Sequence, residues 1–331
     1  MAFGKKVKSQ DVADLAGVSR TTVSLVMNGR DDSIPEKTRH KVLDAANELG
    51  FVPSAVARQL RRGRSRIVLC LAPGWMPSGR ADELWGGLSR QLDEKGFTCV
   101  FSRSAGSTTS LRQLLSELNP GVVAPFFPLQ SNDLRLLDRL NIPVAEVYMS
   151  RSGNDLDTPW RRFQHDVGVT QAAYLLESGV TRIAYLGTSD HLGADISADR
   201  LLGARETVEA AGLSLTACES VDLSEVALKA AIERMRDLDV EAVCAFNDDY
   251  AAALLGAAKS AGIEVPRQMR VIGVDDLYLG RYLSPSLTSV NYRNNFADIY
   301  TPQIVAAYEG RTAEVDPDLG LDLWVVRRES A

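Results

Sequence analysis

The chain has 331 residues, 45% of them apolar and 24% charged, which allows a small domain and a larger one with separate cores. Its net charge of −6 is uneven: residues 1–66 hold 13 Lys and Arg against 7 Asp and Glu, net +6, and residues 67–331 hold 24 against 36, net −12. This asymmetry predicts a basic end that binds a polyanion and a larger acidic body. The sequence has no apolar run of roughly 18 residues and no apolar signal-peptide core, so we expect a cytoplasmic protein and not a membrane-spanning one.

A helix-turn-helix is predicted near the start of the chain. Ser9 can cap a helix that ends at about Ala16, because the apolar residues that follow it have helical spacing. Gly17 can form the tight turn, and Ser19 can cap a second helix that ends at about Asn28.

A third helix, opened by Pro35 and stopped by Gly50, completes a headpiece that we assign to residues 1–52. Its core is predicted from inward-facing side chains of the second and third helices and of the turn before the second: Val18, Val23, Val26, Val42, Leu43, Ala46 and Leu49.

The outer face of the second helix carries short or polar side chains, which suit base edges and phosphates better than core packing. They are Arg20, Thr21, Ser24, Leu25 and Asn28. The alternative is a three-helix bundle with a solvated polar face, and the next segment argues against it.

Residues 53–66 predict a short hinge helix surrounded by arginines, with Val56 and Leu60 one turn apart. A helix of about two turns is unstable alone in water, so it should order only against a partner. Two copies packed through Val56 over DNA would supply that partner, while Leu60 wedges into the minor groove and arginines such as Arg61 neutralise phosphates.

These segments resemble the headpiece and hinge of the lac repressor (LacI/GalR) family of bacterial transcription regulators. The matching stretches are Asp11-Val12-Ala13, Ala16-Gly17-Val18-Ser19, Thr22-Val23-Ser24, Leu49-Gly50-Phe51 and Ala57-Arg58-Gln59-Leu60. The resemblance implies a homodimer on a pseudo-palindromic operator of double-stranded DNA. The DNA-binding residues that we assign are Ser9, Ser19, Arg20, Thr21, Thr22, Ser24, Leu25, Asn28, Ala57, Leu60 and Arg61.

Four positions in this segment bear on the expected base contacts and helix cap. Arg20 and Thr21 match positions at which this family varies its base contacts. Leu25 stands where relatives often carry Arg or His, so it favours a contact with a thymine methyl group. Lys8 replaces the usual Thr, which moves the capping role to Ser9 or weakens it.

Residues 67–331 predict an α/β body in which parallel sheets are covered by helices. Strands are predicted at 67–71, 98–101, 122–125, 144–148, 182–186, 242–246 and 271–274. Helices are predicted near 82–95, 110–118, 131–140, 167–178, 199–211, 224–237, 248–261 and 294–309. We expect two lobes, one of about 67–164 plus 291–320 and the other of about 165–290 plus 321–331, with a ligand beyond the carboxyl ends of the strands.

The body resembles the periplasmic-binding-protein fold of the same family in its stretches Arg200-Leu201-Leu202-Gly203, Phe246-Asn247-Asp248 and Val271-Ile272-Gly273-Val274-Asp275-Asp276. The resemblance implies that Arg200, Asn247 and Asp275 contact an effector, although each could instead be a helix cap or a satisfied buried polar group. Asp166 resembles a family Asp that is as much structural as ligand-binding.

Three aromatic residues depart from the family pattern and could also line the effector site: Trp75, Tyr148 and Tyr292. Aromatic rings stack on a sugar face or on a planar metabolite equally well, so the effector stays unnamed. Cys70, Cys99, Cys218 and Cys244 have no metal-ligand spacing and are expected to be core thiols. We expect no cofactor and no metal.

The leading interpretation is a transcriptional repressor whose operator affinity is set by a small metabolite. Control by a partner protein is the alternative. A transport receptor is disfavoured, because it would require an export signal and would have no use for the basic segment at residues 1–66. An enzyme is disfavoured, because His40, His165 and His191 have no convincing nucleophile partner.

Overall fold

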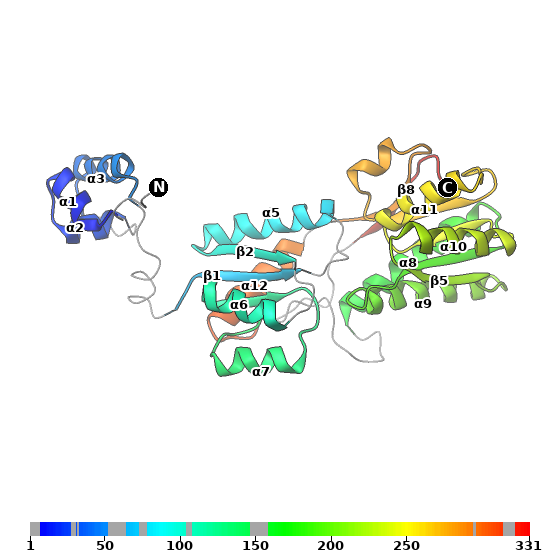
Figure 1. The fold of residues 1–331 in the computed structure, drawn as a ribbon, viewed down its shortest axis with the longest axis horizontal. Helices are drawn as coiled ribbons and strands as arrows, with labels where there is room; N and C mark the ends of the chain where they lie inside the picture. The colour runs from blue at the N-terminus through cyan, green and yellow to red at the C-terminus, as the bar shows by residue number, and fades with distance from the viewer. Residues whose placement is uncertain are drawn as a thin grey trace. The chain divides into compact units, whose positions relative to one another are not determined.

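The computed structural model describes residues 7–27, 31, 33–51, 64–72, 78–103, 108–145, 158–293, 296–313 and 322–331. The chain divides into two compact units, Met1–Ser65 and Arg66–Ala331 (Figure 1). Within the residues described, no helix has both the length and the apolar character needed to cross a bilayer.

The described residues of the first unit form the three helices that the sequence predicts: α1 (Ser9–Ala16), α2 (Arg20–Val26) and α3 (Glu36–Leu49). Gly17 ends α1 at φ 67°, a left-handed conformation that glycine adopts without strain. The buried core comes from all three helices: Val12, Ala13, Val23, Val26, Val42, Ala45 and Ala46.

Two details of this unit differ from the prediction. Leu43 is 39% exposed, and Ala45 is buried instead. Helix α3 buries the face formed by Val42, Ala45 and Ala46, and Leu43, one residue after Val42, is turned about 100° around the helix axis from Val42. Lys8, not Ser9, is the N-cap of α1, and the Asp11 carboxylate accepts a hydrogen bond of 2.7 Å from the Lys8 backbone N–H.

The second unit contains a three-stranded parallel sheet in the order β2-β1-β3. Its strands are β1 (Ile67–Ala72), β2 (Thr98–Arg103) and β3 (Val122–Pro125). Four helices pack around it: α5 (Ser78–Glu94), α6 (Thr108–Leu118), α7 (Ser131–Arg139) and α12 (Phe296–Tyr308). Side chains of β1 alternate, so that Val68 and Cys70 share a core with α5, and Leu69 and Leu71 share one with α6 and α7.

A six-stranded sheet in the order β5-β4-β6-β7-β8-β9 forms the rest of this unit, and only β9 is antiparallel to its neighbour. Its strands are β4 (Ile183–Thr188), β5 (Ala217–Val221), β6 (Ala242–Ala245), β7 (Arg270–Val274), β8 (Thr288–Tyr292) and β9 (Leu323–Val326). The helices are α8 (Pro159–Glu177), α9 (Ala194–Ala210), α10 (Glu225–Asp237), α11 (Asp248–Ser260) and the 3₁₀ helix η1 (Tyr278–Tyr282).

The predicted α/β class with parallel sheets is confirmed, but several elements were missed or shortened. The edge strand β5 lacks a continuous buried run, and β8 contains buried Thr288 and Ser289, so neither has an apolar signature. Of the strand expected at 144–148, the described part forms an isolated bridge between Val144 and Val123. Helix α8 begins eight residues earlier than expected, at Pro159.

The division of the body into two lobes stays a prediction. Two of its proposed boundaries, after residues 164 and 290, fall inside α8 and β8. The hinge helix predicted within 53–66 lies largely outside the described residues. Of the cysteines, Cys70 and Cys244 are buried as expected, whereas Cys99 is half-buried and Cys218 is exposed.

Helices α8 and α9 pack with their backbones in close contact. A Cβ atom added to Gly168 would lie 1.9 Å from the Arg200 carbonyl oxygen, and one added to Gly203 would lie 2.0 Å from the His165 carbonyl oxygen. Only glycine permits this approach, which fixes the two helices in one register.

Candidate functional site

The start of α2 is fixed by its cap. The Ser19 Oγ accepts a hydrogen bond of 3.1 Å from the Thr22 backbone N–H, and the two hydroxyl oxygens are 2.9 Å apart. The predicted cap is therefore confirmed, and both hydroxyls already have an intramolecular partner.

The other predicted DNA-binding residues of α2 lie away from the core. Arg20 and Thr21 are exposed, and Ser24 and Leu25 are half-buried. The Arg20 guanidinium makes no hydrogen bond or ion pair with any residue that the structure describes, so it is available to an outside acceptor. Ser9 is half-buried in the first turn of α1.

The predicted DNA and hinge residues Asn28, Val56, Ala57, Leu60 and Arg61 lie outside the described residues, as do the predicted effector residues Trp75 and Tyr148.

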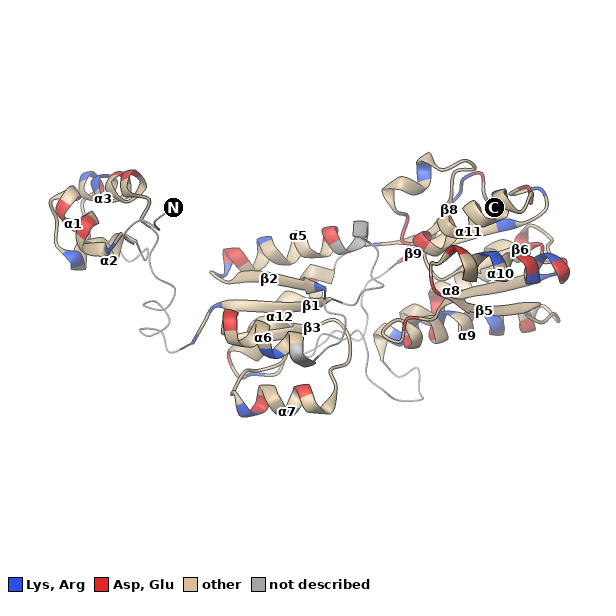
Figure 2. Cartoon of the chain, in the orientation of Figure 1, with Lys and Arg blue, Asp and Glu red and all other residues tan. Residues whose placement is uncertain are grey.

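Lys and Arg side chains are mixed with Asp and Glu side chains in the described part of the first unit (Figure 2). Residues 7–27, 31, 33–51 and 64–65 hold 6 Lys and Arg and 6 Asp and Glu. The excess of +6 in residues 1–66 comes instead from Lys5, Lys6, Arg30, Arg66 and three hinge arginines (Arg58, Arg61 and Arg62), less Asp32. Attraction to a polyanion therefore depends mainly on the segments that flank the helical bundle.

In the second unit, Asn247 and Asp275 follow β6 and β7, which are neighbouring parallel strands, so both lie at the same edge of the sheet. Asn247 is 1% exposed and caps α11, its Oδ1 accepting a hydrogen bond of 3.1 Å from the Tyr250 backbone N–H. Its buried Nδ2 has no hydrogen-bond partner among the described residues. A buried donor without a partner is costly and marks a place for an acceptor.

Arg200 reaches the same edge from α9. It is 4% exposed and lies inside this helix, which begins at Ala194, five residues earlier than expected. Its Nε donates to the Gln164 Oε1 at 2.8 Å, its Nη1 donates to the Phe246 carbonyl oxygen, and its guanidinium lies 5.2 Å from the centre of the Phe246 ring. The side chain is held rigidly beside Asn247, the next residue after Phe246.

Asp275 occupies a left-handed conformation at φ 101° and is 4% exposed. Its backbone N–H donates to the Val290 carbonyl oxygen at 2.8 Å, and its Oδ1 accepts a hydrogen bond of 2.7 Å from the Tyr292 hydroxyl. A side chain with positive φ persists only where its surroundings hold it, which is typical of functional sites.

Asp248 and Ser289 hold the turn that follows Asp275. The Asp248 Oδ2 accepts from the Leu277 backbone N–H and its Oδ1 from the Ser289 Oγ, both at 2.7 Å, while the Ser289 Oγ accepts from the Asp276 backbone N–H at 2.9 Å. Burial raises the pKa of Asp248 well above its ordinary value, and repulsion from Asp275 adds to that effect.

The sequence analysis missed the first two turns of α8, which supply Gln164 and two buried aromatic side chains. Phe163 contacts Tyr292, with ring centres 5.1 Å apart, and Trp160 contacts Phe163. The Trp160 Nε1 is buried without a hydrogen-bond partner in the described part of the chain. Thr158 followed by Pro159 is a helix-start signal that would have placed these residues.

Asp166 lies apart from this group. Its side chain is 61% exposed, and its Oδ1 is 3.1 Å from the His165 Nδ1. The His165 Nε2 is 2.9 Å from the Glu206 Oε2 on α9. Partial burial opposes the charged form of His165, but these two carboxylates outweigh it and raise its pKa. The contact between His165 and Glu206 therefore joins α8 to α9.

The assembled groups can recognise a polar molecule. Arg200 and Asn247 offer donors and Asp275 offers a carboxylate acceptor, while Phe163, Phe246 and Tyr292 supply apolar faces. The described residues contain no cluster of His, Cys, Asp or Glu that could hold a metal ion.

Comparison with known families gives two matches. Residues 9–54 match the family described as bacterial regulatory proteins, lacI family, and residues 172–297 match the periplasmic binding protein-like domain. The first contains α1 to α3, and the second contains Arg200, Asn247, Asp275 and Tyr292.

Individual relatives agree along most of the chain. The HTH-type transcriptional repressor PurR of Vibrio atlanticus is 29% identical over 300 residues, which cover 85% of this chain and 86% of the relative. The HTH-type transcriptional regulator CelR of Thermobifida fusca is 30% identical over 298 residues, 85% of each chain.

The fold is similar to that of the lac repressor dimer crystallised with operator and the anti-inducer ONPF, with a TM-score of 0.74 and 22% identity over 98% of this chain and 99% of the other. The relatives are regulators and not enzymes, in agreement with the sequence analysis. The protein described here thus belongs to the lacI family of bacterial regulatory proteins and is a DNA-binding transcriptional regulator.

Proposed function

We propose that the chain represses transcription from an operator and that a small polar metabolite, bound at Arg200, Asn247 and Asp275, controls its operator affinity. The observation that carries this proposal is the buried Nδ2 of Asn247, which has no hydrogen-bond partner among the residues described. It lies at the same sheet edge as Asp275 and beside the fixed guanidinium of Arg200. A ligand hydroxyl can accept from the amide and donate to the carboxylate at once.

The ligand should carry hydroxyl or amide groups, because the site offers both donors and a carboxylate acceptor. Four carboxylates, those of Asp248, Asp249, Asp275 and Asp276, lie at this edge, and two of them have a cation nearby. Arg328 pairs with Asp276, and the charge of Arg103 acts on Asp249. The anti-inducer in the lac repressor structure is a precedent for a small molecule in a protein of this fold.

The operator would be bound by α2 and by the hinge. Arg20, Thr21, Ser24 and Leu25 would read base edges, with Asn28 beside them, and the hinge would insert Leu60 while Ala57 and Arg61 lie near the backbone. The protein would act as a homodimer, with Val56 of each copy facing the other. Oxidation of Val56→Cys should then cross-link two chains, and operator should promote the reaction.

The test measures operator affinity of the full chain by fluorescence anisotropy while a metabolite panel is added. Arg200→Ala should remove the response and leave affinity without metabolite unchanged, since charge-assisted hydrogen bonds to ligand contribute roughly 1.5–3 kcal/mol each. Arg205→Ala, an exposed arginine of the same helix, should respond as the parent does. A normal response in Arg200→Ala would refute the assignment, and a response to no metabolite would favour control by a partner protein.

A further inference from the structure

Tyr292 links the proposed ligand site to a second part of the molecule. It is the last residue of β8 and is buried, and its hydroxyl donates to the Asp275 Oδ1 at 2.7 Å. A hydrogen bond to a charged acceptor is strong and directional, so it sets the orientation of the Asp275 carboxylate in the absence of ligand and leaves the second oxygen, Oδ2, to a ligand. The sequence predicts a direct contact of Tyr292 with a ligand, and in the structure its hydroxyl donates to the Asp275 carboxylate.

The Tyr292 ring is also the first member of a continuous row of rings. Tyr292 contacts Phe296 at the start of α12, with ring centres 5.8 Å apart. Phe296 stacks on Tyr300, with ring centres 5.9 Å apart and an angle of 8° between the ring planes. Phe296 also contacts Trp160 of α8 at 5.6 Å. Helix α12 therefore begins against rings that belong to the six-stranded sheet and its helix α8.

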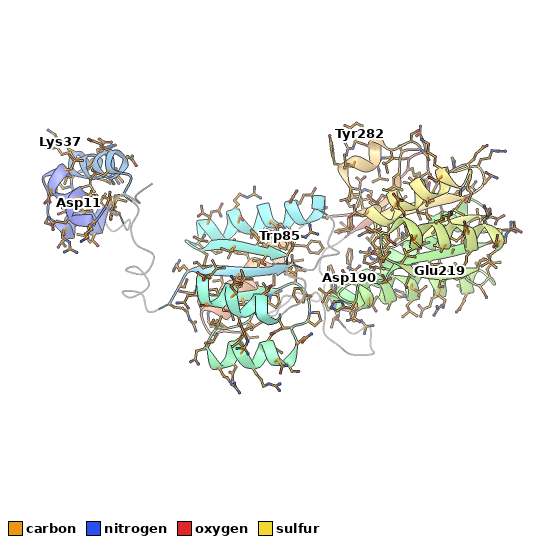
Figure 3. The ribbon with its side chains drawn as sticks, viewed as in Figure 1. Asp11, Lys37, Trp85, Asp190, Glu219 and Tyr282 are labelled. Atoms are coloured by element: carbon orange, nitrogen blue, oxygen red, sulfur yellow. The ribbon has the colours of Figure 1, made fainter. Side chains whose placement is uncertain are left out.

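The same row continues into the three-stranded sheet. Tyr300 contacts Phe126, the residue after β3, at 5.3 Å, and Phe126 contacts Trp85 of α5 at 5.0 Å. Trp85, which is labelled in Figure 3, has its ring centre 4.7 Å from that of Phe101 of β2. We call Tyr292, Phe296, Tyr300, Phe126 and Trp85 the aromatic row. It runs without a break from the Asp275 carboxylate to the helix α5.

We propose that Tyr292 is a positioning residue for Asp275 and that the aromatic row transmits the state of this carboxylate to the three-stranded sheet. The inference rests on the proposed function, because it takes Asp275 as a ligand-binding residue. When a ligand donor engages Asp275, the carboxylate turns and the Tyr292 hydroxyl follows it. Rings in a close-packed interior cannot absorb such a shift independently, so Phe296 and Tyr300 move with Tyr292.

Contact between side chains does not by itself demonstrate coupling, so the test measures coupling directly. The full chain is labelled with 5-fluorotryptophan, and the resonance of Trp85, one of 4 tryptophans, is assigned by Trp85→Phe. Asp275→Gly removes the carboxylate and suits the left-handed backbone at φ 101°. Tyr292→Phe removes only the hydroxyl and keeps the ring. The two changes are made singly and together.

Each single change should move the Trp85 resonance in the same direction, and Asp275→Gly should add almost nothing when Tyr292→Phe is already present, because both remove one hydrogen bond. Tyr282→Phe, at an exposed tyrosine of η1, should leave the resonance in place. Phe296→Leu interrupts the row but keeps the Asp275–Tyr292 bond, and should abolish the response of Trp85 to Asp275→Gly.

The proposal is overturned if Asp275→Gly moves the Trp85 resonance equally with and without the Tyr292 hydroxyl, or if neither change moves it. No ligand is added, so the result is independent of whether a metabolite is found. If no metabolite changes operator affinity but the variants of Asp275 and Tyr292 move the Trp85 resonance as expected, the aromatic row remains an internal coupling route. If a metabolite acts through Arg200 but the Trp85 resonance does not respond as expected, the ligand site stands without this route.

Discussion

The Gln164 Oε1 accepts a hydrogen bond of 2.8 Å from the Arg200 Nε, and this bond joins α8 to α9 at the proposed ligand site. Both side chains are almost fully buried. The arginine is therefore held by a residue 36 positions earlier in the chain, in a helix turn that the sequence did not mark as functional.

Gln164→Ala should lower the free energy of unfolding by about 1–3 kcal/mol, because it leaves a buried guanidinium N–H without an acceptor. Gln164→Glu keeps an acceptor at the same place and should retain most of the stability. Urea unfolding of the two variants checks this. The interpretation is wrong if alanine and glutamate have equal effects.

Gly203→Ala should be among the most damaging single-methyl additions in the protein, since its Cβ would lie 2.0 Å from the His165 carbonyl oxygen. Separating two packed helices costs about 1–3 kcal/mol or more. Gly256→Ala in α11 is the matched control, because nothing lies within 4 Å of the added atom. The control should be neutral or slightly stabilised, and thermal unfolding of both variants would reveal any departure from this order.

Asp248 should make the protein less stable as the pH rises. Because burial raises its pKa in the folded chain, the folded state binds the proton more tightly than the unfolded state, whose value is near 3.8. The resulting stabilisation is complete below that value and is lost as the pH rises through the folded pKa.

Asp248→Asn carries no charge at any pH. Relative to the parent, its free energy of unfolding should increase as the pH rises above the unfolded-state pKa of the Asp248 carboxyl, near 3.8, and through the higher folded-state pKa. Asp237→Asn, at a side chain that is 76% exposed, serves as the control and should show no comparable trend. A constant difference between Asp248→Asn and the parent across this range would contradict the expectation.

Arg20→Ala should change which operator sequence is preferred, with roughly 1–3 kcal/mol lost at an altered base contact. The exposed guanidinium has no partner in the described part of the chain, so its removal should not affect folding. Selection of binding sites from a random DNA library checks the result. An unchanged selected motif would remove Arg20 from the specificity residues.

Affinity for operator should fall steeply with salt, with a log–log slope of about −5 to −10 for a dimer. Replacing Arg61 and Arg62 by alanine should make that slope shallower for every DNA sequence alike, because the described helical bundle, residues 7–27, 31 and 33–51, carries 5 positive and 6 negative side chains. Lys37→Ala on α3 is the comparison. If it reduced the slope as much as the hinge variants, the hinge would not be the main source of attraction.

The amino-acid pattern by itself determined the three headpiece helices, the α/β class and the polar residues that follow β6 and β7. These depend on local signals: Ser19 as a cap, Gly17 in a left-handed turn, and apolar runs that end in Asn247 or Asp275. Each such signal acts over a few residues, so it can be recognised without knowledge of distant contacts.

Only the tertiary structure decided the contacts between residues that are far apart in the sequence. Strand β8 forms although Thr288 and Ser289 are polar, because Ser330 donates to and accepts from the neighbouring backbone and Asp248 accepts from Ser289. The partnership of Gln164 with Arg200 needs the glycine contacts that bring α8 against α9. The hydrogen bond between the Tyr292 hydroxyl and the Asp275 carboxylate likewise joins residues of two neighbouring strand ends, and only the packed sheet places them 2.7 Å apart.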